Sequence, residues 1–355
     1  MAERKIRFGL LGAGLIAPFH AKAVIAAPDA ELVGFADRIE DRATALAGQF
    51  GCKAWTSLEA MIAEGNIDVV DIMIPNHLHH LPAIEAAKAG KHILVEKPPA
   101  MALANVDAMM AAARENNVRI AVVLNCRTKP AIKAMRDAVD QGRFGKIYQV
   151  DAFMKWWRST EYYLGDAWRQ RKDAGAGATV QQGFHYIDLM QHLGGKVVSV
   201  DARMGNLAHP QVAVDDTVRS FVEFENGAVG SFIGSTALWP GQDIRIEISG
   251  ERGTAIMVGE RMAVWKFRDE RPEDEAIRQI GIGSGPSGAT GQADFDFVSH
   301  QMIVEDFTRA ILSGGEPIAT GSSARHTLEI ALAMYKSANQ GAPVKLPLLD
   351  ETGIF

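Results

Sequence analysis

A glycine-rich turn near the N-terminus constrains the fold more than any other feature of this sequence. The apolar run Ile6–Leu11 leads directly into the turn Gly12–Ala17, which reads Gly-Ala-Gly-Leu-Ile-Ala, and a helical pattern follows. The first glycine makes a tight turn, the second lets the backbone approach a bound group, and the small Ala17 keeps the helix close to the strand. Strand, turn and helix of this kind predict a Rossmann-type α/β domain at the N-terminus.

Short β-type runs and helical runs continue to alternate through the first part of the chain. The predicted strands are Ile6–Leu11, Glu31–Ala36, Val69–Ile74, His92–Val95 and Arg119–Leu124. The predicted helices are Leu15–Ala27, Ile39–Phe50, Leu58–Ala63, Leu81–Ala89, Leu103–Asn116 and Pro130–Gln141. We place the domain boundary after residue 126, so that residues 1–126 form the first domain.

From about Lys146 the pattern changes, because strand-like runs follow one another without obligatory helices between them. These runs are Ile147–Met154, Val197–Met204, Asp216–Glu225, Ala228–Ser235, Ile244–Ser249 and Thr254–Val258. Asn226-Gly227 lies between two alternating runs and is a strong hairpin signal. The other predicted segments are a helix around Tyr186–Leu193, a mobile loop at Gly281–Gly291 and helices near Phe297–Leu312 and Ala324–Asn339. Residues 127–355 are therefore predicted to form an α+β domain with a mostly antiparallel sheet.

Charge and cysteine content exclude several classes of partner and site. The net charge is −6, and acidic and basic residues are interspersed, which argues against nucleic acid or a membrane surface as partner. Cys52 and Cys126 lack the spacing of a disulfide framework or a structural zinc site. The N-terminus has no apolar signal region, and no run reaches the ~18 apolar residues of a membrane span. We expect a cytoplasmic protein that acts on a small molecule.

A dinucleotide is the ligand that the glycine-rich turn predicts. Its pyrophosphate would lie against the start of the first helix, where backbone N–H groups and the helix dipole favour an anion. Asp37 ends the second predicted strand about 20 residues beyond the turn, where a carboxylate can accept hydrogen bonds from both ribose hydroxyls. The same carboxylate repels a 2′-phosphate and so favours NAD over NADP, although Arg38 next to it is a residue type that pairs with that phosphate.

Several segments resemble one known family. The predicted strand His92–Val95 leads into Glu96-Lys97-Pro98. Ligands bind beyond the carboxyl ends of strands in an open α/β sheet. The other segments are the Gly12 turn, Pro75–His79, Gly90–Val95, Gly183–Asp188 and Gly341–Pro347. Together they resemble the glucose–fructose oxidoreductase/inositol dehydrogenase (Gfo/Idh/MocA) family over nearly the whole chain.

This resemblance implies a Rossmann domain followed by a substrate domain with a large open sheet, in a homodimer or homotetramer. It also implies that Lys97 is the catalytic lysine and that His185 is the histidine paired with it. The commonest family pattern has an aspartate four residues before that histidine, but Gln181 stands there in this sequence, followed by Gln182. A glutamine side chain can hydrogen-bond a hydroxyl but cannot act as a base. Proton transfer is therefore left to Lys97 and His185.

General chemistry supports the same pair. Oxidation of an alcohol needs a base for the O–H proton while hydride leaves the carbon, and a histidine with a pKa of ~6.5 suits that task near neutral pH. An ammonium group can stabilise the developing alkoxide instead. We assign His185 as the general base and Lys97 as the electrostatic stabiliser or proton partner, and these two roles are exchangeable.

Two sets of residues are predicted to surround the reacting groups. The cofactor set is Gly12, Gly14, Leu15, Ile16, Ala17, Asp37, Arg38, Ile74, Pro75, Asn76, His79, Glu96, Lys97 and Asn125. The substrate set is Lys97, Arg127, Trp157, Arg158, Tyr163, Trp168, Arg169, Gln181, Gln182 and His185, with aromatic faces for a sugar ring and arginines for a carboxylate or diphosphate. An ordinary core with surface arginines explains the aromatic part equally well. Asp188 is predicted to orient nearby backbone or His185, and His300 to line the site.

No metal site is predicted. His185, Asp188 and His192 share one helix face, but positions i and i+7 are ~10 Å apart along the axis, too far for one ion. The predicted function is NAD-dependent oxidation of a secondary hydroxyl in a sugar, cyclitol or nucleotide sugar. Two alternatives stay open, a glycosidase of the same fold that uses NAD transiently and a non-catalytic dinucleotide sensor.

Overall fold

The chain forms two compact units in a computed structural model that describes residues 4–282 and 297–355. The first unit contains Met1–Asn125 and Asp296–Arg325, and the second contains Cys126–Phe295 and His326–Phe355. The predicted loop Gly281–Gly291 lies outside the described residues except for its first two positions. Among the described helices, none combines the length and apolar character needed to cross a membrane.

The first unit is built on a six-stranded sheet in the order β3-β2-β1-β4-β5-β6, with every neighbouring pair parallel. Its strands are β1 (Ile6–Leu11), β2 (Ala30–Ala36), β3 (Lys53–Trp55), β4 (Val69–Ile72), β5 (His92–Val95) and β6 (Ile120–Val122). Its connecting helices are α1 (Ala17–Ala26), α2 (Glu40–Phe50), α3 (Leu58–Glu64), α4 (His80–Lys88) and α5 (Leu103–Glu115). This strand order is that of a doubly wound dinucleotide-binding sheet, which confirms the predicted Rossmann domain.

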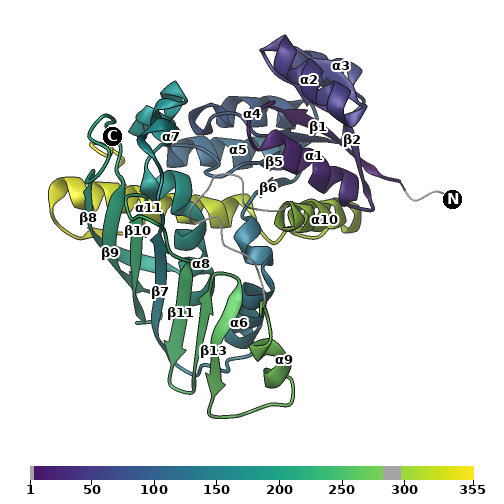
Figure 1. Ribbon diagram of the computed structural model, residues 1–355. Helices are drawn as coiled ribbons and strands as arrows, with labels where there is room; N and C mark the ends of the chain where they lie inside the picture. The colour runs from purple at the N-terminus through teal and green to yellow at the C-terminus, as the bar shows by residue number, and fades with distance from the viewer. Residues whose placement is uncertain (1–3, 283–296) are drawn as a thin grey trace. The chain divides into compact units, whose positions relative to one another are not determined.

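A late segment of the chain, which the sequence analysis placed with residues 127–355, packs in this first unit. Helix α10 (Val298–Ser313) packs against α1 and β2, as Figure 1 shows, and buries Ile303, Val304 and Phe307 in the core of the unit. Farther on, Val122 N–H donates to the carbonyl of Ala319 at 3.0 Å. Helical periodicity predicted this helix but carries no information on which sheet it covers.

The second unit is built on an eight-stranded sheet in the order β13-β12-β11-β7-β10-β9-β8-β14. Its strands are β7 (Ile147–Lys155), β8 (Val197–Gly205), β9 (Thr217–Phe224), β10 (Val229–Ser235), β11 (Arg245–Gly250), β12 (Gly253–Val258), β13 (Arg261–Phe267) and β14 (Val344–Lys345). Among the described strands of this second sheet, only β7 and β10 pair in parallel, so the predicted mostly antiparallel sheet is confirmed. The strands β3, β13 and β14 were not predicted from the sequence.

Helices cover one face of this sheet. The long helices are α6 (Pro130–Asp140), α8 (Phe184–Gly194) and α11 (Gly321–Gln340), and the short ones are α7 (Thr160–Leu164) and α9 (Asp274–Arg278). Helix α8 packs on β7, β10 and β11, and its side chains Phe184, Ile187 and Leu189 are fully buried. The other face carries alternating exposed side chains along β9, as the burial of every second residue shows.

Candidate active site

The glycine-rich turn between β1 and α1 has the geometry of an anion cradle. Gly12 has a φ of +108°, and a Cβ there would lie 2.8 Å from the carbonyl oxygen of Met73, so only glycine fits. Gly14 is exposed, and no described atom lies within 4 Å of the position its Cβ would take. Leu15 is 58 % exposed, and Ile16 precedes the buried Ala17, the first residue of α1. The turn therefore leaves room for a pyrophosphate to approach the start of α1.

Asp37 lies directly after β2 and ties two backbone segments together. Its Oδ2 accepts a hydrogen bond from the Ala13 N–H at 2.8 Å, and its Oδ1 accepts one from the Ile39 N–H at 2.8 Å. A carboxylate has lone pairs left after two such bonds, so it can still accept from ribose hydroxyls. Asp37 is half-buried, whereas Arg38 is exposed beside it.

The segment after β4 contains the predicted cofactor residues Ile74, Pro75 and Asn76, of which Asn76 is buried. His79 is fully buried beyond them, with Nδ1 2.9 Å from the carbonyl oxygen of Pro98 and Nε2 2.7 Å from that of Ile74. Burial lowers its pKa. Both ring nitrogens face backbone oxygens, so His79 links the segments after β4 and β5 instead of presenting a nitrogen to a ligand.

Glu96 and Lys97 follow β5, and the Glu96 carboxylate contacts both the Lys97 backbone and the buried His20 side chain. The Lys97 N–H donates to Glu96 Oε2 at 3.0 Å, and His20 Nε2 lies 2.9 Å from Glu96 Oε1. On its other side, His20 Nδ1 lies 2.8 Å from Asp71 Oδ2. His20 and Asp71 were not predicted, although a carboxylate inside the apolar strand Val69–Ile72 was a visible signal of a buried polar partner.

His300 and Asn125 lie near the same carboxylate, within the first unit. Asn125 Nδ2 is 3.4 Å from His300 Nε2, and His300 Nε2 is 3.9 Å from Glu96 Oε1. Burial lowers the pKa of His300 to about 3. His20, Glu96 and His300 have potential ligand atoms within 4.8 Å of one another. Because His20 and Glu96 are already at hydrogen-bond distance, we interpret this cluster as a hydrogen-bond network and assign no metal to it.

In the second unit, Gln181 and Gln182 lie on a π-helical turn, Ala178–Gln182, directly before α8. The buried Asp215 carboxylate holds this turn by accepting from Thr179 N at 2.9 Å, Thr179 Oγ1 at 2.7 Å and the Tyr335 hydroxyl at 2.6 Å. His185 lies in the first turn of α8 and is half-buried. A turn of this kind is common at functional sites, and it fixes the backbone from which His185 projects.

Asp188, one turn farther along α8, has a different partner from the one predicted. Its carboxylate accepts from Arg127 Nε at 2.7 Å and Nη2 at 2.6 Å, and from Thr327 Oγ1 at 2.8 Å. Arg127 is buried, and its guanidinium group is engaged in this ion pair. The ion pair gives Arg127 a structural role that the sequence analysis, which placed it at the substrate, did not predict. The i+3 spacing from His185 suggested contact on the helix surface, but spacing cannot show an arginine that arrives from another element.

A cluster of aromatic and basic side chains lies between β7 and the π-helical turn. Arg158 is 8 % exposed, and its guanidinium carbon lies 4.9 Å from the centre of the Trp156 ring and 5.9 Å from that of Tyr162. Arg169 lies over Tyr162 at 4.6 Å and over Trp168 at 4.5 Å. The Tyr162 hydroxyl accepts from Arg169 Nη1 at 2.7 Å and Gln182 Nε2 at 2.9 Å. Burial lowers the pKa of Arg158, and the charge of Arg169 lowers it further.

Two predicted substrate residues have partners outside this cluster, although the Tyr163 ring also contacts that of Tyr162, with ring centres 5.1 Å apart. Tyr163 is 1 % exposed, packs with Val212 and Val214, and bonds Thr236 Oγ1 at 2.6 Å, so it is a core residue. Trp157 contacts the exposed Trp239 edge to face, with ring centres 4.9 Å apart. The Arg158 guanidinium lies over Trp156 and Tyr162 instead, and neither of these two was in the predicted substrate set.

Taken together, the parallel sheet, the open glycine turn and the carboxylate after β2 define a dinucleotide-dependent oxidoreductase. The Oxidoreductase family model with an NAD-binding Rossmann fold matches residues 6–124, and the GFO/IDH/MocA C-terminal domain model matches residues 132–256. The chain belongs to the GFO/IDH/MocA family, as the sequence resemblance predicted. Its cofactor is NAD, and the residues around the Gly12 turn and Asp37 fit that cofactor.

Relatives in this family cover nearly the whole chain. The WlbA dehydrogenase of Bordetella pertussis, solved with NADH and UDP-GlcNAcA, has a TM-score of 0.86 and 32 % identity over 97 % of this chain and 100 % of that chain. Levoglucosan dehydrogenase of Pseudarthrobacter phenanthrenivorans is 28 % identical over 98 % of this chain and 100 % of its own length. The scyllo-inositol 2-dehydrogenase (NAD(+)) of Bacillus subtilis is 27 % identical over 97 % of each chain.

Proposed function

We propose that this protein oxidises a secondary hydroxyl of a sugar, cyclitol or nucleotide sugar, with Lys97 and His185 as its catalytic residues. The observation that carries this proposal is the place of Lys97. Lys97 follows the parallel strand β5 in an NAD-binding unit, and its backbone N–H donates a hydrogen bond to Glu96 Oε2 at 3.0 Å. That is the edge of the sheet where ligands of doubly wound domains bind.

Each residue has a defined task in this proposal. Bound NAD would supply the hydride acceptor. His185, from the first turn of α8, takes the hydroxyl proton, and the Lys97 ammonium stabilises the negative charge that develops on the oxygen. Gln181 stands where an aspartate is common in the family, and its amide is suited to a hydrogen bond with a substrate hydroxyl.

Among these substrates we favour one that carries an anionic group, a uronic acid or a nucleotide diphosphate sugar. Arg158 and Arg169 both lie over the Tyr162 ring, and Asp166 Oδ2 accepts from Arg169 Nε at 3.0 Å. An anionic group on the substrate would offset the repulsion between the two guanidinium groups further than this one carboxylate does. Arginine forks match carboxylates and phosphates in two parallel hydrogen bonds. In the described part of the chain, Trp156 Nε1 and Gln182 Oε1 are also buried without a hydrogen-bond partner, and such groups commonly meet a ligand or water.

One substrate panel tests the proposed reaction. The purified protein is incubated with NAD and, in turn, UDP-GlcNAcA, levoglucosan, scyllo-inositol, free sugars and chromogenic glycosides, while NADH absorbance and aglycone release are followed. Net NADH, largest with the anionic substrate, supports the proposal. Aglycone release without NADH would assign the chain to the glycosidases instead. NAD binding without either product would favour the sensor function.

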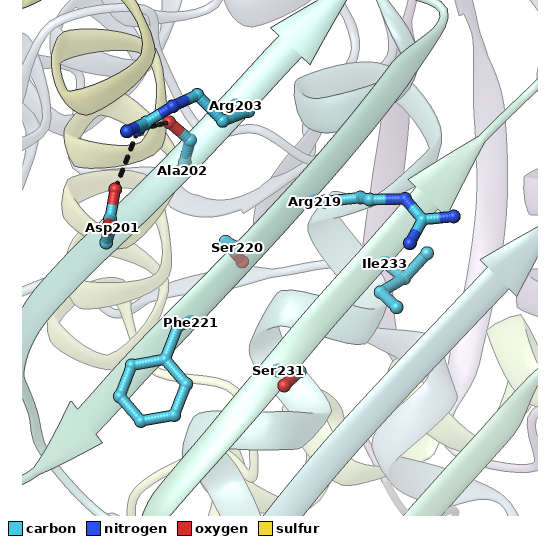
Figure 2. A pocket seen from close by; sticks show the side chains of 8 residues that line it. All are labelled: Asp201, Ala202, Arg203, Arg219, Ser220, Phe221, Ser231 and Ile233. Carbon is cyan, nitrogen blue, oxygen red and sulfur yellow. Dashed lines mark hydrogen bonds and ion pairs between the residues drawn. The ribbon is translucent and has the colours of Figure 1, made fainter. Parts of the chain in front are cut away.

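We also propose that copies of this chain associate through the uncovered face of the eight-stranded sheet. Arg203, Arg219 and Ile233 form one row across β8, β9 and β10, and Asp201, Phe221 and Ser231 form the next. Figure 2 shows these side chains around a shallow hollow, in which Phe221 is 46 % exposed. A second copy related by a two-fold axis would cover the exposed Phe221 side chain of each copy. Sedimentation of the wild type and Phe221→Glu tests this, because the variant should sediment as a monomer, and an unchanged assembly would contradict the proposal.

A further inference from the structure

A buried chain of three polar side chains runs through the first unit to the residue before Lys97. Asp71 comes from β4, His20 from the inner face of α1, and Glu96 from the end of β5. His20 is 1 % exposed and Asp71 is fully buried. The two contacts of the histidine ring, 2.8 Å to Asp71 Oδ2 and 2.9 Å to Glu96 Oε1, place it between two carboxylates.

This geometry is satisfied when the histidine carries both ring protons. An imidazolium donates to both oxygens, whereas a neutral imidazole has one N–H and would need a proton on Asp71, whose pKa is raised by burial. Burial alone would lower the pKa of His20, but the charges and hydrogen bonds of Asp71 and Glu96 raise it to about 10. The other titratable groups around Glu96 are His300 and Lys97, and both favour its ionised form.

Glu96 is consequently fixed at both carboxylate oxygens. Oε1 faces His20, and Oε2 accepts from the Lys97 N–H at 3.0 Å. Burial would raise the pKa of Glu96, but the hydrogen bond and charge of His20 hold it at about 2. The backbone from which the Lys97 side chain leaves is thus hydrogen-bonded to a carboxylate that His20 orients.

We propose that His20 is a positioning residue for Lys97, which acts by locking the Glu96 carboxylate between the Asp71–His20 pair and the Lys97 backbone. The proposal rests on the function given above, in which Lys97 is catalytic. It differs from a purely structural role for a buried histidine, because the contact with Glu96 must matter for turnover more than the contact with Asp71.

Two amide variants separate these contacts. The amide nitrogen of glutamine can take the place of Nε2, so His20→Gln keeps a donor toward Glu96. The amide nitrogen of asparagine can take the place of Nδ1, so His20→Asn keeps a donor toward Asp71 alone. With the best substrate of the panel, we expect kcat to fall about 100-fold in His20→Asn, as for a small misplacement of a reacting group, and about 10-fold or less in His20→Gln. The KM for NAD should stay within about threefold in both variants, because the pyrophosphate and ribose sites are untouched.

A measurement on the unmodified protein keeps the proposal testable if a variant folds poorly. In ligand-free wild type, the ¹⁵N resonances of His20 should report an imidazolium at pH 8, far above the ~6.5 of an ordinary histidine. The Glu96 carboxyl carbon should titrate well below ~4.3. In His20→Asn the Glu96 titration should move up, while His20→Gln should retain much of the depression.

The outcomes distinguish this proposal from the proposed function. Equal losses of kcat in the two variants, or a neutral His20 at pH 8 in the wild type, would overturn the positioning role while leaving the dehydrogenase intact. Absence of NADH formation by the wild type on every substrate would overturn the proposed function, and the role of His20 toward Glu96 would then be decided by the two titrations.

Discussion

Two clusters, one in each unit, hold their charged side chains in different ways. In the first unit, around the Gly12 turn and the end of β5, three carboxylates are bonded inside the protein: Asp37 to backbone N–H groups, and Asp71 and Glu96 to His20. In the second unit, the cluster before α8 contains two guanidinium groups that lie on aromatic rings. A carboxylate with fixed donors is rigid, whereas a cation on a ring face keeps donors for a ligand.

This difference suggests a division of labour. Changes in the first unit should alter cofactor binding or the geometry of hydride transfer, whereas changes in the aromatic and basic cluster should alter which substrate is accepted. Five substitutions, given in order of decreasing expected effect, test this difference.

The largest effect is expected for Lys97→Met. Loss of the ammonium should lower kcat by about 1,000-fold or more, because both its charge and its proton are lost to the reaction. NADH affinity, measured by fluorescence titration, should change less than about threefold, since uniform binding is not removed. Lys88→Met, at an exposed position on α4, is the matched control. A parallel collapse of NADH binding would show that Lys97 serves the cofactor and not the chemistry.

Arg158→Gln should follow, with a selective effect on anionic substrates. We expect kcat/KM for UDP-GlcNAcA to fall about 100-fold, the value of a charge-assisted forked pair, and kcat/KM for a neutral sugar to change much less. Arg171→Gln removes an exposed arginine of the same segment and should leave both values unchanged. Equal losses on charged and neutral substrates would mean that Arg158 supports the fold of the cluster and does not read the substrate.

Asp37→Asn should weaken NAD binding by about 10-fold to 100-fold, since hydrogen bonds to a charged group contribute ~1.5–3 kcal/mol. NADP should lose less affinity, because the carboxylate that repels its 2′-phosphate is gone. Isothermal titration with both dinucleotides measures the ratio, and Asp41→Asn, exposed in the first turn of α2, is the control. The assignment of Asp37 to the adenosine ribose fails if the preference for NAD over NADP is unchanged.

The smallest effects come from two neighbouring tyrosines. Tyr163→Phe removes the hydroxyl bonded to Thr236 in the core and should lower the free energy of unfolding by about 1 kcal/mol without changing kcat/KM. Tyr162→Phe removes the acceptor shared by Arg169 and Gln182, and we expect kcat/KM to fall severalfold with little change in stability. Denaturant titration and steady-state kinetics on both variants check this. The reverse pattern would show that Tyr163, and not Tyr162, belongs to the substrate site.

The sequence predicted the first unit more fully than the second. Strands β1 and β5 have the bounds expected from their apolar runs, and α3 begins directly after Ser57, whose hydroxyl accepts from the Ala60 N–H at 3.2 Å. Here strand, turn and helix are local patterns, and the ligand side of the sheet follows from its parallel topology.

Long-range choices could not be predicted in the same way. The return of α10 to the first sheet depends on which surface its apolar face covers, which periodicity does not encode. Tyr163 and Trp157 were predicted as substrate residues, and Tyr162 and Trp156 were not, because two adjacent aromatic residues give no sequence signal for which of them contacts Arg158. The pairing of Arg127 with Asp188, and of His20 with Asp71 and Glu96, joins residues far apart in sequence.

The position of β7 between β10 and β11 has a consequence for how the second unit folds. Strands β10 and β11 are consecutive in the chain, yet β7 lies between them, parallel to one and antiparallel to the other. The connection 236–244 must therefore pass over the end of β7, where Leu238 N–H donates to the Trp156 carbonyl at 3.0 Å. No local hairpin can nucleate this arrangement, so we expect closure of the sheet to be a slow, late event that also completes the segment bearing Arg158.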